Sequence, residues 1–354
     1  MKKGVKRFVR EKLDENRARH EQFGGSVYLL EPDVKEGEGG LRDIQTARWI
    51  ARANLKVKDL EGLVLAGIVE GTGPLAGPTP VRIETLAQAQ AAVDWYAAHG
   101  YEQIKIYSSF PPPLVAPIAD MAHARGMRVS GHVPAFMLAQ QFIEAGADEI
   151  QHLNFIVLNF FPDVKDTRSK DRYTITADKL QELELDAPAF ADFLRLLQRH
   201  HTVLDPTLSV FQDLYSGAPG RCARSLCALI ERFPPATRRR LLSGAVAVPE
   251  GKEQVYAQAL PALQRLLKTL YDGGVTVMPG TDAFAGYTLH NELALYVQAG
   301  IPAPEVLRLA TLVPAQVLGV AGPSQRGFIA PGKQADMILV DGAPSKDIAH
   351  LRRV

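Results

Sequence analysis

The chain has 354 residues, of which 46% are hydrophobic and 22% charged, so it has enough apolar material for a large buried core, and disordered or collagen-like classes are excluded. Its 40 Lys and Arg balance 39 Asp and Glu, and a net charge of +1 gives no global field that would attract nucleic acid or an anionic membrane. The longest apolar run, 62–69, is too short to cross a bilayer, and no apolar signal region follows the basic start of the chain. We therefore expect a soluble, cytoplasmic protein without a membrane or nucleic-acid partner.

Residues 1–68 differ in character from the rest of the chain. A helix-like opening is followed by the turn-rich segment EPDVKEGEGG at 31–40, and then by residues 41–54, whose apolar positions keep helical spacing. A Pro- and Gly-rich linker follows at 71–80. We predict a helical leader over 1–68.

From residue 81 onward, short apolar strands alternate with helical segments. The predicted strands cover 103–108, 127–132, 149–153, 202–208 and 275–281, with a possible earlier one at 63–69. The predicted helices cover 114–125, 135–145, 189–199, 254–271 and 304–318. Longer insertions at 154–188 and 212–249 follow strands and are expected to lie over the strand ends. This alternation predicts an α/β fold with a parallel sheet, either doubly wound or a (β/α)8 barrel, and the absence of a GxGxxG motif disfavours a dinucleotide-binding sheet.

Several predicted strands contain or end in an ionisable residue. These residues are Lys105, His132, His152 and Asp282. In a parallel barrel the C-terminal strand ends meet at one mouth, so these side chains are expected to converge although they are far apart in sequence. Two imidazoles and a carboxylate suit a divalent metal such as zinc, and a carboxylate beside metal-bound water can pass a proton to a leaving amine. We predict that His132, His152 and Asp282 hold metal and that Asp282 is catalytic, and Lys105 is kept as a candidate because a buried Lys without a partner is costly. The alternative for each His is a hydrogen-bonded structural role.

Two further residues are candidates for contact with substrate. Tyr107 lies two residues after Lys105, hence on the same strand face, and is either substrate-facing or a core aromatic. His290 follows the last strand and either lines the mouth or starts a helix. The two cysteines, Cys222 and Cys227, lie on a helical-looking stretch and are predicted to be free thiols of a reducing compartment.

Longer segments carry a family resemblance: YEQIKIYSS, VSGHVPAFMLAQQFIEAGADEIQHLN, VTVMPGTDAFAGYTLHNELALYVQAGI and GFIAPGKQADMILVDG. Through them, residues from about 70 to 354 resemble the amidohydrolase superfamily, above all its imidazolonepropionase-like and Xaa-Pro dipeptidase-like members. The resemblance implies a (β/α)8 barrel over 69–322 and part of a small β-sandwich over 323–354. It also implies that Lys105 is carboxylated and bridges two metals, that His132 and His152 are ligands, and that Asp282 binds metal and moves protons.

The implied activity is hydrolysis of a carbon–nitrogen bond by a metal-activated water. The substrate would be a dipeptide, an N-acyl amino acid or another small amide, and the metal one or two zinc ions. Members of the family begin with a strand ending in His-x-His, and no His-x-His occurs in this chain. The barrel is therefore expected to lack its first strands, with at most a mononuclear site of His132, His152 and Asp282 and reduced activity.

The front of the chain resembles a different family. The segment EPDVKEGEGGLRDIQTARWIARANLKVKDLEGLV is similar to the helical region of PII-protein uridylyltransferase, without that enzyme's catalytic carboxylate motif. Two alternatives to an active hydrolase follow. One is a catalytically silent fusion or truncated fragment with an interaction role and a homo-oligomeric state, and the other, less favoured, is regulation related to PII uridylylation.

Overall fold

The computed structural model describes Asp14 and residues 65–73, 76–77, 79–216, 220–243, 246, 248–283, 288–319, 326–334 and 337–353. The chain divides into two compact units, 1–64 and 65–354. The account below concerns the second unit. The predicted helical leader lies almost entirely outside the described residues.

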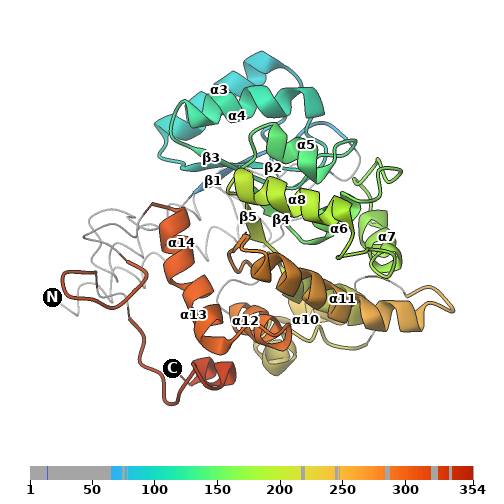
Figure 1. Cartoon of the computed structure of the whole chain (residues 1–354), viewed down its shortest axis with the longest axis vertical. Helices are drawn as coiled ribbons and strands as arrows, with labels where there is room; N and C mark the ends of the chain where they lie inside the picture. The colour runs from blue at the N-terminus through green and yellow to red at the C-terminus, as the bar shows by residue number, and fades with distance from the viewer. Residues whose placement is uncertain are drawn as a thin grey trace. The chain divides into compact units, whose positions relative to one another are not determined.

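The second unit is built on one six-stranded parallel sheet whose strands pair in chain order (Figure 1). The strands are β1 (Ala66–Val69), β2 (Gln103–Ile106), β3 (Arg128–Gly131), β4 (Glu149–Gln151), β5 (Val203–Asp205) and β6 (Thr276–Val277). Each lies within a predicted strand, so the parallel α/β prediction is confirmed. In the described part of the chain β1 and β6 do not pair with each other, and the sheet is open between them.

The two faces of the sheet differ in chemistry, because side chains alternate along each strand. One face carries side chains that are at most 1% exposed: Val69, Ile104, Ile106, Val129, Ile150, Leu204 and Val277. These residues share one core with the helices that follow the strands. Those helices are α3 (Leu86–Ala98), α4 (Val115–His123), α5 (Ala139–Glu144), α8 (Pro188–Arg199) and α11 (Glu253–Asp272).

The other face, called the polar face below, carries Gln103, Lys105, Arg128, Ser130, Glu149, Gln151 and Asp205, which the strand register places side by side. Arg128 Nη2 lies 3.4 Å from Glu149 Oε2, and Gln151 donates to Glu149 Oε1 at 3.1 Å. A doubly wound sheet buries both faces under helices and is apolar on both. The polar residues on this face therefore disfavour a doubly wound sheet and leave a barrel-like sheet as the alternative.

The insertions after β4 and β5 contain helices, as predicted. They are α6 (Asn154–Leu158), α7 (Asp171–Lys179), α9 (Leu208–Ser216), the 3-10 helix η2 (Cys227–Arg232) and α10 (Pro235–Leu241). The chain then continues through α11 and β6 to α12 (Leu289–Gln298). The helix predicted at 304–318 is two helices, α13 (Ala303–Ala310) and α14 (Leu312–Val317), which break at Thr311. Pro314 explains the break, because it has no N–H to donate to the preceding turn.

The C-terminal segment differs from the predicted β-sandwich remnant. Residues 326–334 and 337–353 contain no strand, only the short 3-10 helix η3 (Ile348–Arg352). Ile329 and Leu339 are 87% and 91% exposed, and no second sheet among the described residues covers them. Ile348 and Leu351 of η3, by contrast, are buried in the core.

The prediction of free thiols is wrong in the structure. Cys222 and Cys227 form a disulfide with a Cα–Cα distance of 5.4 Å. The stretch predicted to be helical contains no helix before Cys227, where η2 begins, so the two side chains meet across a short loop. No helix within the described residues is long and apolar enough to cross a membrane.

Candidate active site

Two predicted metal ligands meet at the C-terminal ends of adjacent strands. His132 directly follows β3 and His152 directly follows β4, and both side chains are buried. Their Nε2 atoms lie 3.0 Å apart, with the rings nearly perpendicular. The parallel pairing of β3 with β4 brings together residues that are twenty positions apart in sequence.

Hydroxyl groups from neighbouring strand ends fix both imidazole rings. His132 Nδ1 lies 2.8 Å from Ser108 Oγ, and His152 Nδ1 lies 2.8 Å from Thr207 Oγ1. Because each Nδ1 is occupied, each Nε2 points into the shared space between the rings. Such partners orient the ring of a metal-binding histidine and set its tautomer.

Asp282 completes a group of three with the two histidines. Its Oδ2 lies 3.7 Å from His152 Nε2, and its side chain is 47% exposed, so it borders the open side of the site. His152, Thr207 and Asp282 all have positive φ values, of 71°, 50° and 41°. Non-glycine residues adopt this conformation at a cost, and such residues cluster at functional sites.

Lys105 and Tyr107 lie on the other side of His132. The rings of Tyr107 and His132 have centroids 4.3 Å apart, and Lys105 Nζ lies 5.2 Å from the Tyr107 ring centroid. Lys105 is on the polar face of β2 and acts electrostatically on both histidines and on Asp282. The structure therefore brings five of the six predicted residues into one neighbourhood.

His290 lies apart from this group. It is in the first turn of α12, where the neighbouring charge is Arg352 of η3, and its buried Nδ1 has no hydrogen-bond partner. In the described part of the chain no hydrogen bond or ring contact joins His290 to the other predicted residues. Its role in substrate binding stays a prediction.

Burial controls the charge of these groups. Burial, together with His152 and the nearby cations, holds the pKa of His132 well below its usual value. Burial, Lys105 and Arg172 lower the pKa of His152 to about 3. Both imidazoles are therefore neutral at pH 7. Partial desolvation raises the pKa of Asp282, against the opposing effect of Lys105 and Arg172.

Asp205, the last residue of β5, is a buried carboxyl that the sequence analysis missed. One of its oxygens has no hydrogen-bond partner, and burial, Glu149 and Glu292 raise its pKa well above the usual value. Gly280 packs against it so closely that a Cβ at position 280 would overlap the carboxyl group. The strand-end rule that selected His132 and His152 applies equally to Asp205.

Glu292 of α12 supports the turn that carries Thr207. Its two carboxyl oxygens accept from the backbone N–H groups of Leu208 and Ser209, both at 2.7 Å, and the side chain is fully buried. Burial raises the pKa of Glu292 to about 7 against these hydrogen bonds. Just before this turn, the backbone carbonyl of Asp205 accepts a hydrogen bond from the backbone N–H of His152, at 2.8 Å.

Arg172 of α7 is the second residue that the sequence analysis missed. Its Nη1 donates to Ser108 Oγ at 2.9 Å, and Ser108 in turn contacts His132. Arg172 is in the insertion after β4, where neither hydrophobic periodicity nor a strand end marks it. The insertion thus contributes a cation to the site.

The spacing of the two histidine nitrogens is close to that around a zinc ion. Two nitrogens bound to one tetrahedral zinc are about 3.3 Å apart, given Zn–N distances of about 2.0–2.1 Å, and the two Nε2 atoms are 3.0 Å apart. Among the described residues no three His, Cys, Asp or Glu side chains are arranged as a metal cluster. The donor types of His132, His152 and Asp282, two imidazole nitrogens and a carboxylate oxygen, suit one divalent ion. Bridging of two ions by Lys105 stays a prediction.

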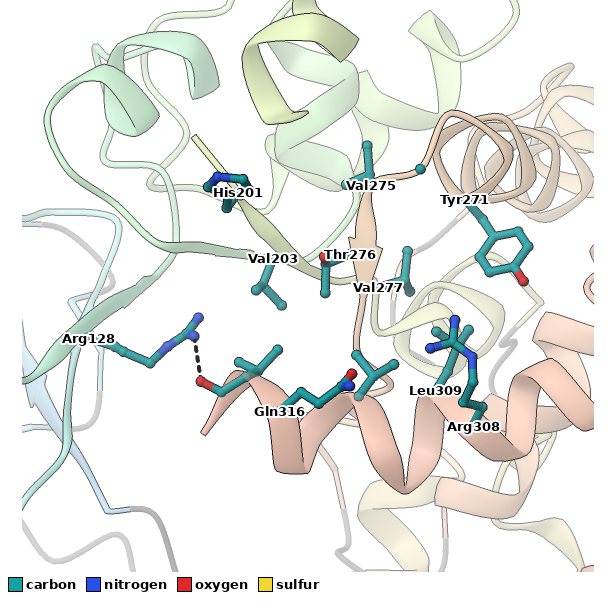
Figure 2. A pocket seen from close by; sticks show the side chains of 13 residues that line it. Arg128, His201, Val203, Tyr271, Val275, Thr276, Val277, Arg308, Leu309 and Gln316 are labelled. Carbon is teal, nitrogen blue, oxygen red and sulfur yellow. Dashed lines mark hydrogen bonds between the residues drawn. The ribbon is translucent and has the colours of Figure 1, made fainter. Parts of the chain in front are cut away.

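A separate cavity of about 520 Å³ lies at the opposite ends of the strands (Figure 2). Arg128, Val203 and Thr276, the first residues of β3, β5 and β6, line it together with α13 and α14. Arg128 closes one side by donating to the carbonyl of Val317 at 3.1 Å (dashed line in Figure 2). This cavity contains none of the predicted site residues.

Comparison with known proteins gives two different answers for the two parts of the chain. A model described as GlnD PII-uridylyltransferase matches residues 7–72. Bifunctional uridylyltransferase/uridylyl-removing enzymes from Erythrobacter litoralis and Novosphingobium aromaticivorans are 49% and 50% identical over 67 and 64 residues, which is 19% and 18% of this chain. The chain spans only 7% of the length of either relative.

The rest of the chain matches hydrolases. A Xaa-Pro dipeptidase with bound methionine has a TM-score of 0.53 and 20% identity, covering 90% of this chain and 70% of its own. A bottromycin amidohydrolase has a TM-score of 0.56 and 21% identity, covering 73% of this chain and 56% of its own. At these identities the likeness shows a shared fold. A model described as the Amidohydrolase family matches residues 108–353, more than half of the chain, and the chain belongs to that family.

Proposed function

We propose that the chain hydrolyses a carbon–nitrogen bond of a small amide or dipeptide at the site formed by His132, His152 and Asp282. The observation that carries the proposal is that His152 Nε2 lies 3.0 Å from His132 Nε2 and 3.7 Å from Asp282 Oδ2. Family membership and the dipeptidase and amidohydrolase folds support it.

The residues divide the work between binding and proton transfer. Neutral His132 and His152, with Nδ1 occupied, offer Nε2 toward the site, and Asp282 offers a carboxylate oxygen on its open side. These three would hold a divalent ion, with zinc proposed, and such an ion when bound supplies Lewis acidity and lowers the pKa of water. Asp282, with its raised pKa, accepts a proton from the attacking water and donates it to the leaving amine.

One observation favours the alternative of a catalytically silent chain. The described residues form no cluster of three metal ligands, which agrees with the missing His-x-His motif. A silent chain would keep the fold of the family and act, if at all, through interactions. A role related to PII uridylylation has weaker support, because the matching segment is 7% of those enzymes.

Metal content decides between these proposals. The full chain is expressed with added zinc, purified without chelator and analysed by inductively coupled plasma mass spectrometry, and a panel of dipeptides and N-acyl amino acids is then tested for hydrolysis. We expect about one metal per chain, loss of it in His132→Ala, weaker binding in Asp282→Asn, and hydrolysis that disappears in both variants. His99→Ala is the matched control, because His99 is exposed and stacks on Trp95. A metal-free wild-type chain without hydrolysis would support the silent alternative.

A further inference from the structure

The cavity at the opposite ends of the strands is large enough for a small molecule. Its volume of about 520 Å³ lies within the range of roughly 300–1,000 Å³ that is typical of small-molecule sites. Its lining comes chiefly from the start of β3, β5 and β6 and from α13 and α14 (Figure 2). His132 and His152 follow the other ends of their strands, so the cavity is separate from the proposed site of hydrolysis.

The lining combines aliphatic side chains with cations. Its aliphatic residues are Val203, Val275, Val277, Leu309, Val313 and Val317. Arg128 and Arg308 add two positive charges, and none of the described residues that line the cavity is acidic. Figure 2 shows the two arginines on opposite sides, with Val203 and Thr276 between them. A ligand that suits these walls has an apolar body and an anionic group.

Arg308 is held in an orientation that suits an anion in this cavity. Its Nε donates to Glu305 Oε2 at 2.8 Å, three residues earlier on α13, and the Tyr271 hydroxyl lies 3.4 Å from the same oxygen. The hydrogen bond to Glu305 takes one of the five N–H donors of the guanidinium and fixes its plane. Donors on the terminal nitrogens remain for the two oxygens of a carboxylate. Figure 2 shows the guanidinium extending from α13 toward Val277 of β6.

Arg128 adds to the positive potential of the cavity from the other side. Its Nη1 donates to the carbonyl of Val317 at 3.1 Å, and its Nη2 lies 3.4 Å from Glu149 Oε2. Its Nε is buried and has no hydrogen-bond partner among the described residues. A buried donor without a partner costs free energy, which an acceptor that reaches it from the cavity would relieve. Both sides of the cavity therefore favour an electronegative group.

We infer that this cavity binds a small aliphatic carboxylate. The terminal nitrogens of Arg308 hold the two carboxylate oxygens, and the aliphatic chain lies against Val203, Leu309 and Val313. A bare inorganic anion fits less well, because it would leave the aliphatic walls without a contact. This binding does not depend on hydrolysis at His132, so the inference stands or falls separately from the proposed function.

Calorimetric titration of the full chain with hexanoate, butyrate and hexan-1-ol tests the inference. The buffer contains a chelator, so that no carboxylate binds through a metal ion at the strand-end histidines. We expect hexanoate to bind about tenfold more tightly than hexan-1-ol, because the alcohol forms no charge-assisted hydrogen bond with Arg308. We expect hexanoate also to bind about tenfold more tightly than butyrate, which buries two CH₂ groups fewer.

Variants identify the cation and the location of the site. Arg308→Gln should remove the preference for hexanoate over hexan-1-ol by weakening the acid alone, and Arg308→Lys should retain part of it. Arg195→Gln is the matched control and should keep the preference. Like Arg308, Arg195 pairs with a carboxylate three residues earlier on its helix, Asp192, but it does not line the cavity. His132→Ala should keep the preference as well.

Several results would overturn the inference. In the wild type they are equal affinity for hexanoate and hexan-1-ol, equal affinity for hexanoate and butyrate, or no binding of hexanoate at millimolar concentration. In the variants they are a preference that persists in Arg308→Gln, or one that disappears in His132→Ala with a native circular dichroism spectrum. The last result would place the carboxylate at the strand-end histidines instead of the cavity.

Discussion

Replacing Glu292 by Gln tests whether this buried carboxyl is protonated in the folded chain near neutral pH. Its pKa is raised from 4.5 to about 7, so between these values the folded state holds a proton that the unfolded state has released. The free energy of unfolding therefore falls as pH rises through this window. At 1.36 kcal/mol per pKa unit, the loss between pH 5 and pH 8 is about 2–3 kcal/mol.

Urea unfolding of wild type and Glu292→Gln at several pH values between 5 and 8 measures this contribution. Gln cannot titrate, so the stability of the variant relative to wild type should rise by about 2–3 kcal/mol across the range. Taking the difference between the two proteins cancels groups that titrate in both, such as the buried histidines. Glu305→Gln is the control, since Glu305 pairs with Arg308 and its pKa is lowered rather than raised. A difference that stays constant from pH 5 to pH 8 would refute the assignment.

Two further substitutions test the packing around the site. Gly280→Ala places a methyl group on the carboxyl of Asp205 and should reduce the free energy of unfolding by about 1–3 kcal/mol, measured with urea. Gly251→Ala is the control: its methyl group points into open space at φ 79°, so it should cost only backbone strain, about 1 kcal/mol. Equal losses in the two variants would contradict the close packing of Gly280 on Asp205. Thr207→Val removes the hydroxyl that orients His152 and should weaken zinc binding about 10- to 100-fold in chelator competition. Unchanged zinc affinity in that variant would show that the hydroxyl does not orient the ring.

The sequence predicted the part of the site that follows from sheet geometry. His132 and His152 end short apolar strands, and adjacent parallel strands must bring such residues together. Asp205, the last residue of β5, obeys the same rule. The hydrogen bonds from Ser108 and Thr207 to the Nδ1 atoms of the two histidines depend on side-chain rotamers, which no spacing pattern encodes.

The remaining differences come from segments without periodicity. Arg172 lies in an insertion whose path depends on tertiary packing, so nothing in the sequence placed it beside Ser108. Cys222 lies in a stretch predicted to be helical, but no helix forms there before Cys227, and the loop between the two cysteines brings their side chains together. Pro314 lies inside the single helix predicted at 304–318, and the chain forms two helices there because proline has no N–H to donate.

The site takes its histidines from the sheet and Arg172 from an insertion, and these two parts differ in how easily their sequence can change. His132 and His152 are tied to strand ends, so moving them means moving the sheet and its core. Arg172 is on α7, a helix of the insertion after β4, and segments that connect strands vary more easily than the strands themselves. Selection, natural or in a directed library, can therefore retune what the site accepts by varying the insertion alone, leaving the strand-borne groups untouched.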